Sequence, residues 1–314
     1  MQFFYYLIFP GFAFAATVGL LTAWVDRKVT ARVQYRVGPP WYQSFADVVK
    51  LLGKEVILPE NARKTGFLLA PIIAFTASSM AAAMLGIYNW NWNAGFVGDI
   101  IVFWYFLAIP ALMLILGAGS SGNPLSAVGS SREIKLLLSY ELPFVIILTM
   151  LIFRAGTLSI GEILKYQFAH GPLLYSVSGV IGFIVVLLCV QAKLGLVPFD
   201  MPEAETELGG GVLYDYSGAA LAGFKLSKAI LLYTLPVFLI TLFWGGIQIG
   251  NGIGLLWGFL KYLLIIVLIT LIRNTNPRLR IDQAIRFFWG KLTILAIIAF
   301  ILQAIGLHNG IQWL

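Results

Sequence analysis

The chain has 314 residues, of which 60% are hydrophobic and only 11% are Asp, Glu, Lys or Arg. Soluble domains carry about 25% charged residues, so this composition, with its mean hydropathy of +0.89, excludes a soluble enzyme, a disordered chain and a secreted disulfide scaffold. The net charge of +7 indicates membrane topology and not nucleic-acid binding, because cytoplasmic loops of membrane proteins are enriched in Lys and Arg.

Long uncharged apolar runs predict an all-α integral membrane protein with eight transmembrane helices. A membrane-crossing helix needs about 20 apolar residues, and such segments recur along the chain. They cover 3–25, 66–88, 99–118, 135–153, 173–194, 217–244, 253–272 and 290–307. The first segment has no basic residue before it, so we expect a retained helix and not a cleavable signal. No linker or repeat divides the sequence, and we expect one membrane domain over 1–314.

The distribution of basic residues predicts the orientation in the membrane. Most of the 21 Lys and Arg residues lie in or beside four alternate loops, at 26–65, 119–134, 195–216 and 273–289. The positive-inside rule places these loops in the cytoplasm and both termini outside. We therefore expect a multi-pass protein of the cell membrane.

The first cytoplasmic segment contains an amphipathic helix candidate at about 44–57. Apolar and polar residues follow helical spacing on opposite sides: Phe45, Val48, Val49, Leu52 and Val56 against Asp47, Lys50 and Lys54. The helix is too short to span, so we expect it to lie in the membrane interface and to end before Pro59.

Two glutamates mark the fourth predicted span. Glu141 lies inside the span, where an unpaired carboxylate is costly, which makes it a candidate proton site. A structural ion pair, for example with Lys228, is the alternative. Glu133 precedes Glu141 by two helical turns, about 12 Å along the axis, and a water-bridged relay between them is feasible.

The loop at about 195–216 is strongly acidic although it lies on the predicted cytoplasmic side. It carries Asp200, Glu203, Glu205, Glu207 and Asp215 and no basic residue. Lys225 and Lys228 share one face of the next span, so this loop and Glu141 are their natural partners. Lys261 lies near the middle of the seventh predicted span, where it is expected to pair with an acid or to relay protons.

The chain offers few ligands for a metal or a redox centre. It has one Cys, Cys189, and two His residues, whereas iron–sulfur clusters are held by several Cys thiolates. We expect no cofactor in this chain, so any electron-transfer groups must sit on partner subunits.

Three groups of residues resemble the complex I subunit 1 family. The first is RVGPP at 36–40 with ADVVKLLGKE at 46–55. Its charged residues, which the resemblance implies for docking, are Arg36, Asp47, Lys50, Lys54 and Glu55. The second is SYE at 139–141, and the third is PFDMPEAETEL at 198–208 followed by DYSG at 215–218. Together these motifs extend over most of the chain.

The resemblance implies eight core helices and a cofactor-free subunit that docks a peripheral arm. That arm carries iron–sulfur clusters and the catalytic large subunit, and antiporter-like membrane subunits lie beside the family member in the bilayer. The acids of the 198–208 motif and Glu141 are implied to carry redox-linked charge changes toward H⁺ or Na⁺ translocation. The chain alone is then non-catalytic, within an oxidoreductase complex.

The same family includes subunits of group 4 membrane-bound NiFe hydrogenases and of complexes that reduce sulfur compounds. After the DYSG motif, complex I members have a basic residue and then a Glu where this chain has Ala220 and Lys228. These departures favour the hydrogenase-like branch. In one type of complex of this branch, a partner subunit carries a NiFe centre. The alternatives are a quinone-binding subunit of an NADH- or ferredoxin-linked complex I and, in a different class, a stand-alone secondary transporter.

Overall fold

The computed structural model describes residues 6–248, 252–310 and 313, apart from the side chains of Glu205 and Thr206, and within this part of the chain the fold is helical with no strand. The longer helices are α2 (Phe12–Val33), α4 (Lys64–Trp90), α5 (Asp99–Gly119), α6 (Pro124–Ala155), α8 (Val177–Lys193), α10 (Gly218–Phe243), α11 (Gly252–Thr275) and α13 (Thr293–His308). The shorter ones are α3 (Gln43–Leu52), α7 (Ile160–His170), α9 (Glu205–Leu208) and α12 (Ile281–Arg286). Single turns form η1 (Trp92–Ala94), η2 (Leu173–Tyr175) and η3 (Gly211–Leu213), and a π-helical segment, η4 (Phe287–Leu292), joins α12 to α13.

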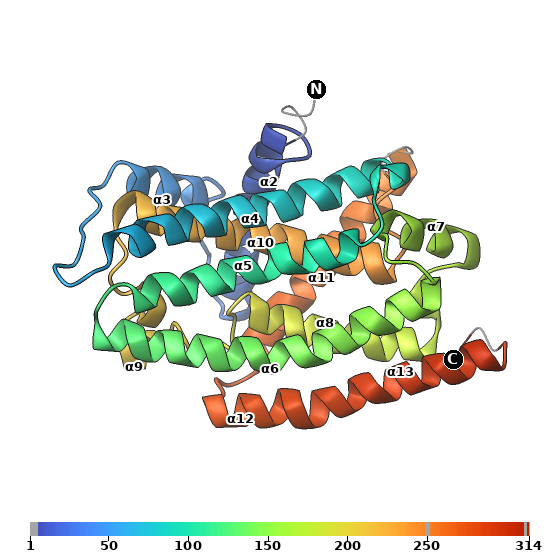
Figure 1. Ribbon diagram of the computed structural model, residues 1–314. Coiled ribbons are helices and arrows are strands. Elements are labelled where there is room, and N and C mark those ends of the chain that lie inside the picture. The colour runs from blue at the N-terminus through green and yellow to red at the C-terminus, as the bar shows by residue number, and fades with distance from the viewer. Residues whose placement is uncertain (1–5, 249–251, 311–312, 314) are drawn as a thin grey trace.

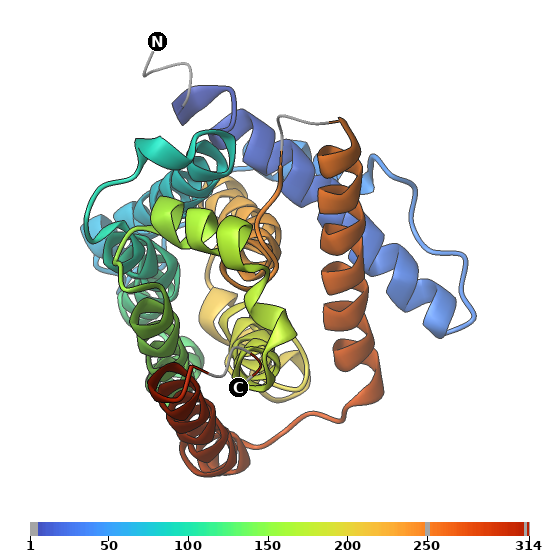
Figure 2. The ribbon, with the colours of Figure 1, turned by 90° about the vertical axis from the view of Figure 1, so that its right-hand side faces the viewer.

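The long helices form one bundle around α10. Helices α4, α5, α6 and α13 run side by side along its length, with α3 and α9 at one end and α7 at the other (Figure 1). Seen from the α7 end, α11 lies across the view and α2 runs diagonally, so both are tilted relative to the others (Figure 2). The apolar stretch of α10 is 83% buried, whereas those of α11 and the α12–α13 helix are 33% buried. Helix α10 is therefore the core, and the other two are peripheral.

Six helices within the described residues are long and apolar enough to cross a membrane. They are α4, α5, α6, α10, α11 and the continuous α12–α13 helix, and α8 is a shorter apolar helix of 17 residues. The exposed side chains of these helices are largely apolar, as in Leu69, Tyr105, Leu256 and Ile298. Lipid supplies the apolar surroundings that these faces need, so the chain is a multi-pass membrane protein.

Several helix bounds differ from the sequence prediction. Helix α6 begins at Pro124 instead of 135, because Asn123 caps its N-terminus by accepting a hydrogen bond from the Leu125 amide, and Pro is favoured in a first turn. The last long helix begins at Ile281 instead of 290. The first predicted span, 3–25, lies partly outside the described residues, and α2 continues past it to Val33.

Helix α3 is shorter than the predicted amphipathic helix. It ends at Leu52, because Gly53 follows and Gly disfavours helix continuation; Pro59 plays no part. One side of α3 packs against α2 and α10 through Phe45 and Val48, while Val49 and Leu52 remain exposed. The helix is thus attached to the bundle on one face and open on the other.

Candidate functional site

Two neighbouring cavities at the α3 end of the bundle are lined by charged side chains. The smaller, about 70 Å³, has five charged lining residues: Glu133, Lys193, Asp200, Glu203 and Lys228. The larger, about 300 Å³, lies among α2, α3, α10 and α11, and its charged lining residues are Asp26, Arg27, Asp47, Glu203, Lys225, Lys228 and Arg273. Glu203 and Lys228 line both cavities, so one ion pair stands where the two spaces meet.

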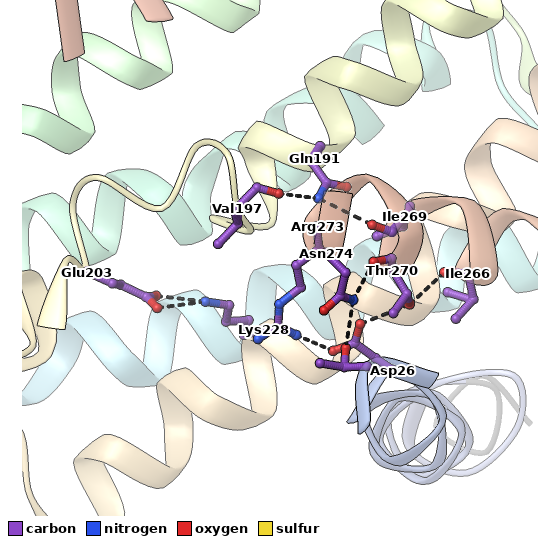
Figure 3. Close-up of polar contacts among 11 residues, drawn as sticks. Asp26, Gln191, Val197, Glu203, Lys228, Ile266, Ile269, Thr270, Arg273 and Asn274 are labelled. Atoms are coloured by element: carbon purple, nitrogen blue, oxygen red, sulfur yellow. Dashed lines mark hydrogen bonds and ion pairs between the residues drawn. The ribbon is translucent and has the colours of Figure 1, made fainter. Parts of the chain in front are cut away.

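That ion pair joins the acidic loop to the central helix. Lys228 on α10 donates to both carboxylate oxygens of Glu203, at 2.8 and 2.9 Å (Figure 3). Both side chains are about one third exposed. The acidic-loop partner predicted for Lys228 is therefore present in the structure, and the pair is open enough to respond to charges nearby.

A second ion pair lies deeper, between α6 and α8. Lys193 donates to Glu141 Oε1 at 2.7 Å, and the Trp104 indole donates to Oε2. The Lys193 side chain is only 1% exposed and its ammonium lies 5.1 Å from the centroid of the Tyr140 ring. The structural partner of Glu141 is thus Lys193, and the pairing with Lys228 considered from the sequence is wrong.

Glu133 lies between these two pairs. It is buried on α6 and lines the smaller cavity with Lys193, Glu203 and Lys228. Because Lys193 also pairs with Glu141, the cavity that Glu133 lines includes the partner of the second glutamate. The cavity is large enough for about one water molecule or two.

A third ion pair, which the sequence reasoning missed, joins α2 to α11. Asp26 is buried and accepts hydrogen bonds from Arg273 and, at 3.0 Å, from Thr270 (Figure 3). Nearby, Gln191 of α8 donates to the carbonyls of Val197 and Ile269. The available signal is the position of Asp26, which follows the uncharged run 1–25 and begins a predicted loop.

The remaining acids of the loop are held individually by basic or polar side chains. Asp200 pairs with Arg278 at 2.9 Å, and its buried Oδ1 accepts no hydrogen bond from the described residues. Glu207 pairs with Arg132 at 2.7 Å. Asp215 accepts from Ser126 at 2.6 Å and from Asn123 at 2.9 Å. The side chain of Glu205 lies outside the described residues.

The segment between α2 and α4 presents its charges at the surface of the same end. Arg36, Lys50, Lys54 and Glu55 are exposed, whereas Asp47 pairs with Arg27 of α2 at 3.0 Å. Burial works against ionisation of Asp47, but hydrogen bonds from Arg27 and Gln43 and the positive charges of Arg27 and Lys225 outweigh it and lower its pKa. This carboxylate therefore stays charged at neutral pH.

The two other predicted lysines separate. Lys225 lines the larger cavity and belongs to the same region. Lys261 does not: its ammonium donates to the Trp244 carbonyl at 2.8 Å, in a third cavity beyond the C-terminus of α10. Of the predicted coupling set, the structure thus gathers Glu133, Asp200, Glu203, Lys225 and Lys228 around the two cavities. Glu141 pairs with a lining residue, Lys193, whereas Glu207 and Asp215 are held by residues of α6 and its cap, and Lys261 lies apart.

The described residues contain no group of three or more His, Cys, Asp or Glu side chains placed to hold a metal ion. Cys189, the single cysteine, is buried in α8. The charged side chains that line the two cavities are carboxylates, lysines and arginines, which can bind protons and form charge pairs.

Comparison with known proteins shows to which family the chain belongs. A family model described as NADH dehydrogenase matches residues 6–304. A subunit of the NADH-quinone oxidoreductase from Brevibacillus brevis is 33% identical over 93% of this chain and 90% of its own length. The subunit of the same name from Thermomicrobium roseum is 35% identical, over 88% and 87% of the two chains.

Among solved structures, a chain of the membrane-bound sulfane sulfur reductase, an archaeal respiratory membrane complex, superposes with a TM-score of 0.81 at 26% identity. The match covers 93% of this chain and 96% of that one. The resemblance drawn from the three sequence motifs is confirmed. The chain belongs to the NADH dehydrogenase family, as a multi-pass membrane subunit of a respiratory complex.

Proposed function

We propose that this chain is the cofactor-free anchoring and coupling subunit of its complex, which links redox chemistry on partner subunits to H⁺ or Na⁺ translocation. The observation that carries the proposal is the pair of cavities that share Glu203 and Lys228. They connect the acidic loop at the α3 end with Glu133 and, through Lys193, with Glu141 inside the bundle.

The physical basis is electrostatic. A unit charge that appears about 10 Å from a carboxylate changes its ionisation energy by roughly 1.7 kcal/mol at an effective dielectric constant of 20, which is more than one pKa unit. A redox step near the loop therefore changes the electrostatic energy of the loop carboxylates and of the basic side chains that pair with them. Lys228 then weakens or strengthens its hold on Glu203, and the change passes to Glu133, Lys193 and Glu141.

The orientation proposed for this mechanism has eight crossings, formed by α2, α4, α5, α6, α8, α10, α11 and the α12–α13 helix. Both termini lie outside, and the α3 end faces the cytoplasm. The exposed side chains of Arg36, Lys50, Lys54 and Glu55 support docking of a peripheral arm there. Iron–sulfur clusters and the catalytic large subunit belong to that arm, and antiporter-like subunits lie beside this chain in the cell membrane.

Replacing Glu141 by Gln tests the coupling role. The change keeps the size and the Trp104 contact but removes the charge that Lys193 neutralises. We expect the complex to assemble and to transfer electrons while ion transport into inverted vesicles falls at least tenfold. Glu162→Gln, an exposed glutamate on α7 at the opposite end, is the matched control. Full transport by the Glu141→Gln complex contradicts the proposal.

A second candidate function is quinone binding in the larger cavity. The names of the bacterial relatives and the apolar lining by Leu20, Val48 and Leu232 favour it. Against it, Lys228 is engaged by Glu203, and Ala220 packs in a separate apolar cluster with Phe67 and Tyr216. These features favour the hydrogenase-like branch.

Metal analysis of the purified complex separates the branches. Nickel together with abundant iron supports the hydrogenase type. Iron without nickel is compatible with reduction of a sulfur compound or of a quinone. The electron acceptor that the complex reduces distinguishes these two reactions. Purification of this chain alone, with neither metal nor partner subunits, supports the stand-alone transporter and contradicts the coupling role.

A further inference from the structure

A third cavity, far from the charged site, lies beside α11 at the end of the bundle that carries α7. Its volume is about 950 Å³, and its lining comes from the η2 turn, the segment after α10 and the first half of α11. It is at the upper end of the range for ligand pockets, about 300–1,000 Å³. Helix α11 contacts α2 and α10 and stands apart from α7 (Figure 2).

The charged group in this cavity is Lys261. Its ammonium donates to the Trp244 carbonyl at 2.8 Å and lies 5.6 Å from the centroid of the Trp244 ring. An ammonium has three donors, so two remain for other acceptors. The whole stretch 216–281 contains no Asp or Glu, and the described lining of the cavity contains no acid.

A cation in such surroundings needs an anion. Burying a charge away from water without a counter-charge is costly, and lysines within membrane spans face a partner or reach an interface. The side chains of a helix point toward its N-terminus, and Lys261 accordingly reaches back to the level at which α10 ends and α11 begins. Its charge therefore lies near one surface of the bilayer, at headgroup depth.

The surroundings of Lys261 match a lipid. Trp257, one turn before Lys261 on the same face, is 61% exposed, and Tyr175 stands across the cavity at 77%. Such amphipathic rings are typical of the membrane interface. Farther along α11, Leu260 and Leu264 line the cavity and remain about half exposed, which leaves an apolar track for an acyl chain.

We propose that this cavity binds an anionic phospholipid, with Lys261 donating to the headgroup phosphate and an acyl chain lying along α11. The occupant is a lipid and not a transmembrane helix of a partner, because the cavity combines a cation at headgroup depth, which no acid of the described lining neutralises, with an apolar track below it. The site is independent of the coupling mechanism, since it shares no lining residue with the two cavities of the charged site.

Trp257 serves as the reporter for the test. The intact complex is reconstituted with phospholipids brominated on the acyl chains, which quench nearby tryptophans, and the Trp257 signal is the difference from a Trp257→Phe complex. We expect brominated phosphatidylglycerol to quench Trp257 at a lower mole fraction than brominated phosphatidylcholine. Lys261→Met should weaken the apparent phosphatidylglycerol affinity on the order of tenfold, the size of one charge-assisted hydrogen bond.

Lys261→Arg should keep the preference, and Lys165→Met, which removes an exposed lysine on α7, should leave it unchanged. Equal quenching by the two lipids, or an unchanged preference in Lys261→Met, overturns the proposal. Absence of quenching by either lipid means that a partner subunit covers the cavity, which also overturns it. Loss of the preference in excess inorganic phosphate at constant ionic strength assigns the cavity to a soluble anion instead.

Discussion

In the ion pair of Glu141 with Lys193, the lysine is almost completely buried and the glutamate is partly buried. Lys193 is 1% exposed while Glu141 is 16% exposed, and the lysine also lies over the rings of Tyr140 and Phe144. A buried pair of this kind contributes little net stability, but removing one partner leaves an uncompensated charge. We therefore expect the effect on stability of replacing either residue to depend strongly on whether the other is present.

A double-mutant cycle measures this dependence. Lys193→Met should destabilise the complex by about 3–5 kcal/mol, because Glu141 loses its counter-charge. Combining it with Glu141→Gln should recover more than half of that loss, since the uncharged amide still accepts from Trp104. Thermal unfolding of the four complexes in detergent gives the coupling energy. Additive losses contradict the pairing.

Asp47 makes the attachment of α3 dependent on pH. Its folded pKa is lower than the usual 3.8, so its contribution to stability is fully present above 3.8 and is lost as the pH falls through the lower folded pKa. We expect faster hydrogen exchange of the α3 amides in the wild type only below about pH 4. Asp47→Asn should exchange faster already at pH 7. Identical exchange of the two proteins at pH 7 contradicts this.

At the level of elements, the sequence predicted the apolar centres of the helices well and their charged ends poorly. Arg132 and Glu133 made the start of α6 resemble a loop, although Pro124 and Asn123 begin the helix there. The helix tolerates these two charged residues because Arg132 pairs with Glu207 and the Glu133 side chain lines the smaller cavity. Periodicity reports the average environment of a segment, whereas such pairings are tertiary and come from residues far away in the chain.

The same reasoning explains which parts of the site were predictable. The acidic loop and Glu141 stood out because they are charged residues where membrane topology does not require them. The partners Lys193 and Asp26 did not stand out, because each lies at the end of an apolar run, where a charge is ordinary. Only the packing of α2 against α11 and of α6 against α8 shows that both are buried.

Gly129 lets the acidic loop lie close against α6. A Cβ added there would meet the Val212 amide nitrogen at 2.7 Å and the Pro202 carbonyl oxygen at 3.1 Å. These are backbone atoms of the loop, so the loop must move, and we expect Gly129→Ala to lower stability by about 1–3 kcal/mol and to reduce ion transport. Gly119→Ala is the control, since a Cβ there meets nothing within 4 Å. Equal stability of the two variants contradicts the prediction.

For the whole molecule, the two ends of the bundle are chemically different. The α3 end carries the acidic loop, its basic partners and the exposed charges of the segment between α2 and α4. At the α7 end, the cavity beside α11 is lined by aromatic and apolar residues and one lysine. This polarity agrees with a subunit that receives a soluble arm on one side only.

The chemical difference between the two ends also predicts how the chain is oriented in the membrane. The single cysteine, Cys189, is buried, so cysteines introduced at exposed positions can be labelled against a low background. Asn61 precedes α4 at the α3 end, and Asn309 follows α13 at the other end; both are exposed. With the positive-inside rule, an impermeant maleimide should label Asn309→Cys in intact cells and Asn61→Cys only after lysis. If only Asn61→Cys is labelled in intact cells, the chain has the opposite orientation. The acidic loop and the docking surface would then lie outside, and the basis for coupling to a cytoplasmic arm would be lost.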